Sequence, residues 1–346
     1  MRIASVIRPE SVNANYRARI PLLALGERGH EHQLFDAHEL PHLGMFRGFD
    51  VVHFCRLWEE PFQYLARALR DEGIGVTWDC DDNLPAIERD TESFRLVGGH
   101  LGPQVARDLE SMMEIAHVVT TPSHGLVSDF ERIAADVRLI ENYLAPPMVL
   151  RILPPRINPK LRIGWVAGDE HMTDVARLRI RETILRILAY HPQVEFIFVG
   201  FGLGLEHPRY HRIPGVELLE LPSVIAQFDI GIAPLSRTPF NRGRSNIKIK
   251  EYAVAGTPWL ATDLDPYHDL GEDQGGRLIN NDEWERALLD LIGDGNARRQ
   301  LAARARAWGK LQDIMFHLHE WESTFEDAIA IARGEVAGNL GQDIGA

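Results

Sequence analysis

The chain has 346 residues, 45% of them hydrophobic and 25% charged, which is the composition of a soluble globular protein with room for two domains. Its formal net charge of −13 argues against nucleic acid as a partner and gives no general attraction to an anionic membrane, although a local basic patch can still make a peripheral membrane contact. No apolar run is long enough to span a bilayer, and the charged, interrupted N-terminus does not have the pattern of a signal peptide. Cys55 and Cys80 are too few for a disulfide framework or a zinc site, so we expect a cytoplasmic protein.

The first half of the chain alternates short apolar runs with helical stretches, including 62–70 and 105–115. Strands separated by helices of this length predict βαβ units and a parallel sheet. No glycine lies between Met1 and Leu25, so the loop after the first strand lacks the dinucleotide fingerprint, which argues against NAD. The expected strands are 2–7, 32–36, 50–55, 75–81, 117–122 and 137–142.

A second alternation follows five prolines at 145–159, which have the composition of a linker. A helix to about 190 follows its first strand, and the chain turns helical again from Asp282 to about Arg333. Two doubly wound halves therefore make up the chain, an arrangement that two Rossmann domains of a dehydrogenase would also produce. The expected strands of this half are 161–168, 194–200, 216–221, 229–235 and 257–263.

The segment 229–263 reads as strand, loop, helix and strand, with the helix capped by Ser245 or Asn246 and ended by Gly256. Cations crowd the first turn of this helix, where the macrodipole disfavours them unless an anion binds. Phosphate is the obvious candidate for that anion. The alternative is a surface helix with solvated arginines and a pair between Lys248 and Glu251. The crowded cations are Arg242, Arg244, Lys248 and Lys250.

The pattern Lys248-x-x-Glu251-Tyr252-Ala253-x-Ala255-Gly256-x-Pro258 resembles the donor-binding helix of GT-B fold glycosyltransferases, in particular family 4 of retaining, nucleotide-sugar-dependent enzymes. The resemblance implies that Glu251 holds the nucleotide ribose. It also implies that basic residues and helix N–H groups hold the diphosphate, and we assign that role to Arg244, Ser245, Asn246 and Lys248. Gly243 stands where the family has a second glutamate, and the usual arginine and lysine are missing from the loop in GWVAGDEHMTDV.

Further loops follow the carboxyl ends of expected strands, where parallel sheets bind ligands. In the resembling enzymes the first loop faces the cleft, so Tyr16 and Arg17 are candidates to touch the acceptor or the donor phosphate; a solvated loop is the alternative. In the second half, Gly202 and Gly168 can let backbone approach the nucleotide and the diphosphate. The resemblance places His171 near the donor phosphates.

Asp79, Asp81 and Asp82 form a dense acidic group after the strand that begins at Gly75, so they need a cation, hydrogen bonds or a shared proton. A metal site is one interpretation of this Asp-x-Asp motif, but the GT-B context disfavours a metal ion and we predict none. We predict instead that Asp81 or Asp82 borders the acceptor hydroxyl or the sugar as a catalytic group. The alternative is that these aspartates cap the next helix or pair with Arg56, which ends the preceding strand on the acceptor side.

The sequence thus predicts an α/β protein of the GT-B class, with two Rossmann-like, doubly wound parallel-sheet domains facing a cleft. We place the acceptor domain at 1–154, the donor domain at 155–310, a helix packing back across the cleft at 311–335, and a frayed tail at 336–346. The expected activity is that of a hexosyltransferase-like glycosyltransferase of glycan biosynthesis, retaining and metal-independent, without a cofactor. It would move a sugar from a nucleoside diphosphate to a glycan, lipid-linked or small-molecule acceptor. A nucleotide-sugar epimerase and a catalytically silent sugar-binding domain are the alternatives.

Overall fold

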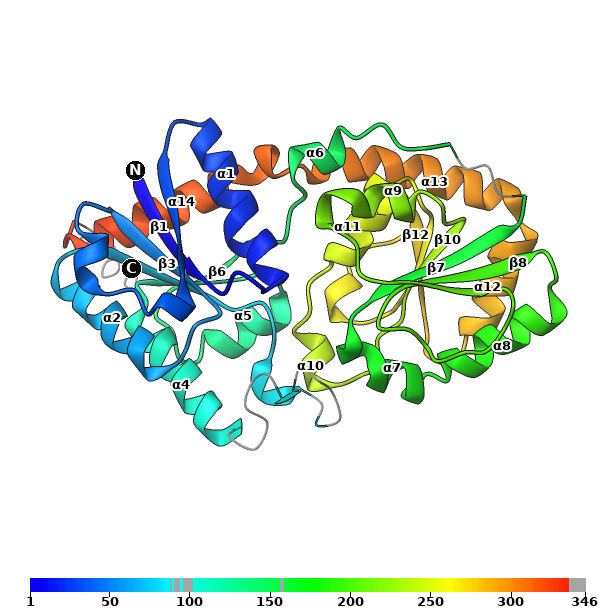
Figure 1. Cartoon of the computed structure of the whole chain (residues 1–346), viewed down its shortest axis with the longest axis horizontal. Helices are drawn as coiled ribbons and strands as arrows, with labels where there is room; N and C mark the ends of the chain where they lie inside the picture. Colours follow the sequence, from blue (N-terminus) through cyan, green and yellow to red (C-terminus); the bar gives the residue numbers. More distant parts are fainter. Residues whose placement is uncertain (88, 90–93, 96–101, 156–158, 336–346) are drawn as a thin grey trace, which may run out of the picture. The chain divides into compact units, whose positions relative to one another are not determined.

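The computed structural model describes the chain except for residues 88, 90–93, 96–101, 156–158 and 336–346, so the tail predicted at 336–346 lies outside the described residues. The chain forms two compact units, each with its own sheet (Figure 1). Unit 1 contains Met1–Pro85, 102–142 and the segment that begins at His317. Unit 2 contains Tyr143–Phe316 and the short stretch that begins at Ala86. No helix in the described part of the chain has the length and hydropathy that crossing a bilayer requires.

Unit 1 is built on a six-stranded sheet of order β2-β1-β3-β4-β5-β6, in which every pair is parallel. The order reverses between β1 and β3, and the carboxyl ends of strands at such a reversal are where doubly wound sheets bind ligands. Its strands are β1 (Arg2–Ile7), β2 (Glu31–Asp36), β3 (Val51–Cys55), β4 (Gly75–Asp79), β5 (Val118–Thr121) and β6 (Val137–Leu139). Its helices are η1 (Asn15–Arg19), α1 (Ile20–Glu27), η2 (Ala37–Glu39), η3 (Leu43–Phe46), α2 (Glu60–Asp71), α4 (Gly102–Ile115) and α5 (His124–Phe130).

The last helix of the chain, α14 (Ile314–Ala332), begins in unit 2 and then packs into unit 1. His53 of β3 meets the ring of Trp321 edge-on at 5.5 Å between centroids, and Phe325 at 5.8 Å. Burial lowers the pKa of His53 to about 4, so this imidazole is neutral in the core. The helix therefore completes the hydrophobic core of the N-terminal sheet.

Unit 2 has a second six-stranded parallel sheet, of order β12-β11-β10-β7-β8-β9. The predicted α/β class, with two doubly wound parallel sheets, is confirmed. The strands are β7 (Leu161–Ala167), β8 (Val194–Gly200), β9 (Tyr210–Ile213), β10 (Ile230–Ala233), β11 (Trp259–Thr262) and β12 (Gly276–Ile279). The helices are α6 (Pro146–Val149), η6 (Asp169–His171), α7 (Met172–Arg177), α8 (Ile180–Tyr190), η7 (Leu218–Glu220), α9 (Leu221–Ile225), α10 (Pro239–Arg242), α11 (Ile247–Val254), η8 (Asp265–Tyr267), η9 (Glu272–Gln274), α12 (Trp284–Gly293), α13 (Gly295–Gly309) and η10 (Lys310–Gln312).

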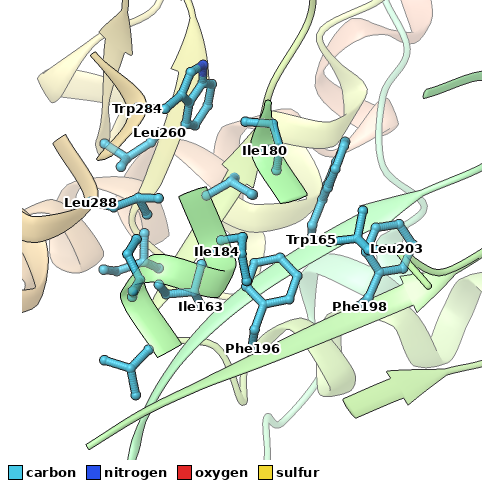
Figure 2. Close-up of a cluster of buried hydrophobic side chains, with 14 of the residues drawn as sticks. Ile163, Trp165, Ile180, Ile184, Phe196, Phe198, Leu203, Leu260, Trp284 and Leu288 are labelled. Atoms are coloured by element: carbon cyan, nitrogen blue, oxygen red, sulfur yellow. The ribbon is translucent and has the colours of Figure 1, made fainter. Parts of the chain in front are cut away.

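Hydrophobic side chains cover both faces of this second sheet, because alternate residues of a strand point to opposite sides. Phe196 and Phe198 of β8 belong to the core under α8 and α12, where Trp165 and Ile184 lie beside them (Figure 2). The intervening Ile197 belongs to the core on the other face, which also contains residues of α9 and α11. The sheet is therefore a middle layer between two helical layers.

One predicted strand of unit 2 was wrong, and two strands were not predicted. Residues 216–221 do not form a strand; they contain η7 and the first residue of α9. Pro222 lies in the first turn of α9, where proline is favoured, and Leu221 and Ile225 are buried at helical spacing. The two missed strands, β9 and β12, are the edges of the sheet, and their half-exposed, partly polar residues give a weak pattern.

The ion pair between Arg17 and Asp79 generates a prediction about the stability of unit 1. Both side chains have no exposed surface, and their closest atoms are 2.7 Å apart. Replacing Arg17 by methionine leaves a buried carboxylate without its partner, so the free energy of unfolding should fall by about 3–5 kcal/mol. The measurement is urea unfolding followed by circular dichroism. Arg2→Met is the matched control, because its pair with Glu31 is exposed and should be worth under about 1 kcal/mol. Equal unfolding midpoints for the two variants would contradict the assignment.

Candidate functional site

The predicted anion-binding segment contains a short helix, α11, whose first turn lies at the carboxyl ends of the central strands β7 and β10. Gly256 has a φ of +68°, as expected for the residue after a helix end. Asn246 is the residue before the first turn, but its side chain makes no capping hydrogen bond to the helix. The strand order of the sheet reverses between β7 and β10, so α11 lies at the place where doubly wound sheets bind ligands.

Tyr252 fixes α11 in the gap between these two strands. The register of β7 and β10 pairs only residues up to Gly164 and Gly231. Beyond them, the hydroxyl of Tyr252 donates to the Ile232 carbonyl at 2.8 Å and accepts from the Val166 N–H at 3.3 Å. A Cβ on Gly231 would lie 2.9 Å from the Tyr252 ring, so glycine is required there. The phenol thus replaces the missing strand-to-strand hydrogen bonds.

Lys248 lies one helical turn before Tyr252 and bonds to the same strand. Its ammonium group donates to the Val166 carbonyl, and the residue is partly buried. Burial lowers the pKa of Lys248, although the nearby carboxylate of Glu251 opposes that shift. Glu251 itself is 6% exposed. The two side chains place one cation and one carboxylate at the carboxyl end of β7.

Arg244 provides the second cation of the site, from the loop before α11. Its guanidinium donates to Glu170 Oε1 at 2.9 Å and to His171 Nε2 at 3.3 Å. Burial favours the acid form of Glu170, but the charge of Arg244 and the hydrogen bond that it donates outweigh burial and lower the pKa of Glu170 to about 2. Glu170 is therefore a carboxylate at neutral pH.

Asp174 orients His171, and its role was not predicted from the sequence. Its Oδ2 lies 2.8 Å from His171 Nδ1, and its Oδ1 accepts from Asn241 and from the N–H and hydroxyl of Ser236, each at 2.7 Å. Burial and the charge of Arg244 lower the pKa of His171, which is neutral with Nδ1–H donated to Asp174. The spacing His171-x-x-Asp174 within one helical turn is the signal that sequence reasoning overlooked.

Two of the four cations predicted to converge do so, and the other two are placed elsewhere. Lys250 is fully buried, and its ammonium lies 4.1 Å from the centroid of the Tyr143 ring. Arg242 ends α10 and is exposed. The residues of a helix turn point in different directions, so a cluster in the sequence is not a cluster in space. Arg244 and Lys248 remain as the candidate phosphate ligands.

The other predicted donor residues surround this position or lie on the next strand. Ser245 and Asn246 lead into α11, and Asn246 is buried. Gly168 follows β7 directly. Gly202 follows β8 with a φ of +95°, and a Cβ there would lie 2.8 Å from Arg212 Cδ. Their contacts with a nucleotide stay predictions.

In unit 1, the structure corrects the expectation for Arg17. Its guanidinium has no exposed surface and bonds to Asp79, the Ile140 carbonyl and Asn142, so it holds the unit together rather than facing a substrate. Tyr16 is 6% exposed in η1, a turn of π-helix. A sequence shows that a loop is charged but not that its charge has a buried partner.

Arg56 pairs with both predicted catalytic aspartates, one of the two arrangements considered from the sequence. Its Nη1 lies 3.0 Å from Asp81 Oδ1 and 3.0 Å from Asp82 Oδ2. Arg56 has a φ of +54°, a strained conformation for a residue with a side chain. Burial raises the pKa of Asp81 to about 6, although the charge of Arg56 opposes the shift. Within the described residues, no group of three or more His, Cys, Asp or Glu could hold a metal ion.

The raised pKa of Asp81 predicts how stability depends on pH. The folded-state pKa of about 6 lies above the ordinary value of 3.8, so the cost of the buried charge is fully present above pH 6 and is relieved as the pH falls toward 4. Asp81→Asn should therefore raise the free energy of unfolding at pH 8 by about 1–3 kcal/mol, with a smaller gain at pH 4. Urea unfolding at several pH values measures this. Asp82→Asn removes a charge from the same arginine and should give no such gain. A stability gain for Asp81→Asn that does not change with pH would count against the assignment.

No protein-family model matches the chain, and no curated protein sequence does. Solved structures match it in three dimensions. Anabaena HepE, in complex with UDP and glucose, is 14% identical with a TM-score of 0.67, covering 94% of this chain and 99% of that chain. An alpha-glucosyltransferase in complex with UDP is 12% identical with a TM-score of 0.64, covering 94% and 100%. A putative UDP-N-acetylglucosamine 2-epimerase from Listeria monocytogenes is 11% identical with a TM-score of 0.57, covering 100% and 99%.

The expected likeness to GT-B glycosyltransferases is thus confirmed in three dimensions, while the narrower likeness to family 4 stays a prediction. At these identities the likeness shows the fold alone. Two Rossmann-like units, each with a six-stranded parallel sheet, give this protein the GT-B fold.

Proposed function

We propose that this protein is a glycosyltransferase that moves a sugar from a nucleoside diphosphate to an acceptor hydroxyl. The observation that carries the proposal is the pair of cations, Arg244 and Lys248, at the start of a helix where β7 and β10 separate. The dipole of the helix and the two cations together favour an anion at this place. HepE and the alpha-glucosyltransferase, at 14% and 12% identity to this chain, are both in complex with UDP, which supports a diphosphate as the anion.

Each donor residue has a distinct part in the proposed reaction. Arg244, Lys248 and the N–H groups of Ser245 and Asn246 bind the diphosphate and stabilise the negative charge that develops on it as the sugar leaves. Glu251 accepts hydrogen bonds from the ribose hydroxyls. Because cations of the protein neutralise the leaving group, we propose that the reaction needs neither a metal ion nor a cofactor. Retention of configuration is proposed on the resemblance to family 4.

Unit 1 supplies the acceptor side of the proposed reaction. Asp81 and Asp82 lie after β4 and Arg56 after β3, at the carboxyl ends of neighbouring strands. A carboxyl group with a pKa near 6 suits a group that exchanges a proton with a hydroxyl near neutral pH. The acceptor is a glycan, a lipid-linked sugar or a small molecule. The two free, buried cysteines fit a reducing compartment such as the cytoplasm.

Titration of UDP and GDP against purified protein tests the donor site. Lys248→Ala removes a charged donor at the diphosphate position and should weaken binding by about 1.5–3 kcal/mol. Isothermal titration calorimetry measures the change. Lys160→Ala is the matched control. It also removes a lysine, but Lys160 directly precedes the amino end of β7, whereas Lys248 lies at the carboxyl end of the same strand. Unchanged affinity of Lys248→Ala for every nucleotide that the wild type binds would remove Lys248 from the site.

A nucleotide-sugar epimerase is the second candidate, because the Listeria structure named a putative epimerase matches this chain over its whole length. The two activities differ in their products. A glycosyltransferase releases a nucleoside diphosphate, whereas an epimerase converts one intact nucleotide sugar into another. A catalytically silent sugar-binding domain does neither.

Mass spectrometry of nucleotide sugars incubated with the protein distinguishes these activities and also tests metal independence. We expect release of the nucleoside diphosphate at equal rates with excess EDTA and with magnesium or manganese, because Arg244 and Lys248 carry the phosphate charge. Activity that is lost with EDTA and restored by manganese would show that the reaction needs a metal. An isomerised nucleotide sugar without release of diphosphate would show an epimerase.

A further inference from the structure

The carboxylate of Glu170 lies against the backbone of Gly168, the residue that directly follows β7. A Cβ placed on Gly168 would lie 2.9 Å from Glu170 Cδ, so the side chain of Glu170 covers the face that the glycine leaves open. Glu170 belongs to η6 and its side chain is 23% exposed. The open backbone of Gly168, which the sequence marks as room for a diphosphate, is thus occupied by a carboxylate.

This carboxylate makes the contacts that a phosphate oxygen would make. Its Oε1 accepts from Arg244 Nη2 at 2.9 Å and lies 3.8 Å from His171 Nε2. Arg244 is also the residue that we assign to the diphosphate. The same guanidinium is therefore bound to an internal anion.

The charges around this position do not allow a diphosphate simply to be added. Two cations, Arg244 and Lys248, face three carboxylates, which are Glu170, Asp174 and Glu251. The low pKa of Glu170 excludes relief by protonation at neutral pH. Asp174 is held by four hydrogen bonds, whereas Glu170 is partly exposed on a short turn. Glu170 is the carboxylate that can rotate toward solvent.

We propose that Glu170 is an internal substitute for the donor phosphate, and that a nucleoside diphosphate binds by displacing its carboxylate from Arg244 and from the face of Gly168. The inference rests on the proposed donor site. Binding is then an exchange of one anion for another at a preformed cation. The free site is kept neutralised and ordered, and affinity is lowered by the free energy of the ion pair that must break.

Removal of the charge at position 170 tests the exchange, because the proposal predicts a gain in UDP affinity rather than a loss. Glu170→Gln should bind UDP about three- to tenfold more tightly than the wild type, because the competing ion pair is gone. A residue that merely positions Arg244 would give the opposite result. Inorganic pyrophosphate, as a competitor of bound UDP, should gain to a similar extent, whereas uridine should not gain. Isothermal titration and competition titration measure these affinities.

Glu285→Gln is the matched control, since it also removes a carboxylate paired with an arginine of the same unit, Arg186, at a distance of 2.6 Å, but on the exposed surface. It should leave UDP affinity unchanged. Glu170→Ala is the second variant, and thermal unfolding checks that both variants of Glu170 are folded. If the wild type binds UDP and neither folded variant binds it more tightly, the exchange is overturned while the donor site stands. If neither the wild type nor the variants bind a nucleoside diphosphate, the proposed donor site fails, and the exchange with it.

Discussion

The separation of β7 from β10 is the constraint on which the candidate donor site depends. Adjacent parallel strands normally continue their hydrogen bonds to the end of the ladder, but here the register stops at Gly164 and Gly231. The unpaired polar groups of Val166 and Ile232 must be satisfied in the interior, and the hydroxyl of Tyr252 satisfies one on each strand. The helix that carries this tyrosine is thereby fixed with its first turn at the strand ends, where Lys248 of the helix and Arg244 of the preceding loop lie.

Each unit contains an arginine–carboxylate pair, but the two pairs differ in their exposure to solvent. The pair between Arg17 and Asp79 in unit 1 has no exposed surface. Thr120 also donates to Asp79, so the carboxylate is bound by groups of the protein and not by solvent. The Arg244 pair in unit 2 is partly exposed on both sides. Desolvation holds a fully enclosed pair together, whereas a pair open to solvent can exchange one partner for another at modest cost. Exposure separates a structural ion pair from one that can take part in binding.

Sequence patterns predicted the elements that are buried and regular. The strands Arg2–Ile7 and Val194–Gly200 have the predicted bounds, because continuous apolar runs mark central strands. The end of α11 just before Gly256 followed from glycine's tolerance of positive φ. The partners of charged side chains were not predictable in the same way. Arg17 meets Asp79 and Asp174 meets Ser236, each more than sixty positions away, and no local pattern reports such a pairing.

The path of the chain between the two units has a consequence for the order of folding during synthesis. Unit 2 is complete once Phe316 has been made, but unit 1 lacks α14 until the chain beyond His317 emerges. Trp321 of that helix covers the guanidinium of Arg17 at 5.1 Å and the ring of His53. Until then, the core of the first unit to be translated stays open to water. Unit 1 therefore completes its core only after unit 2 has been synthesised, and the nascent chain depends on α14 to close the sheet of unit 1.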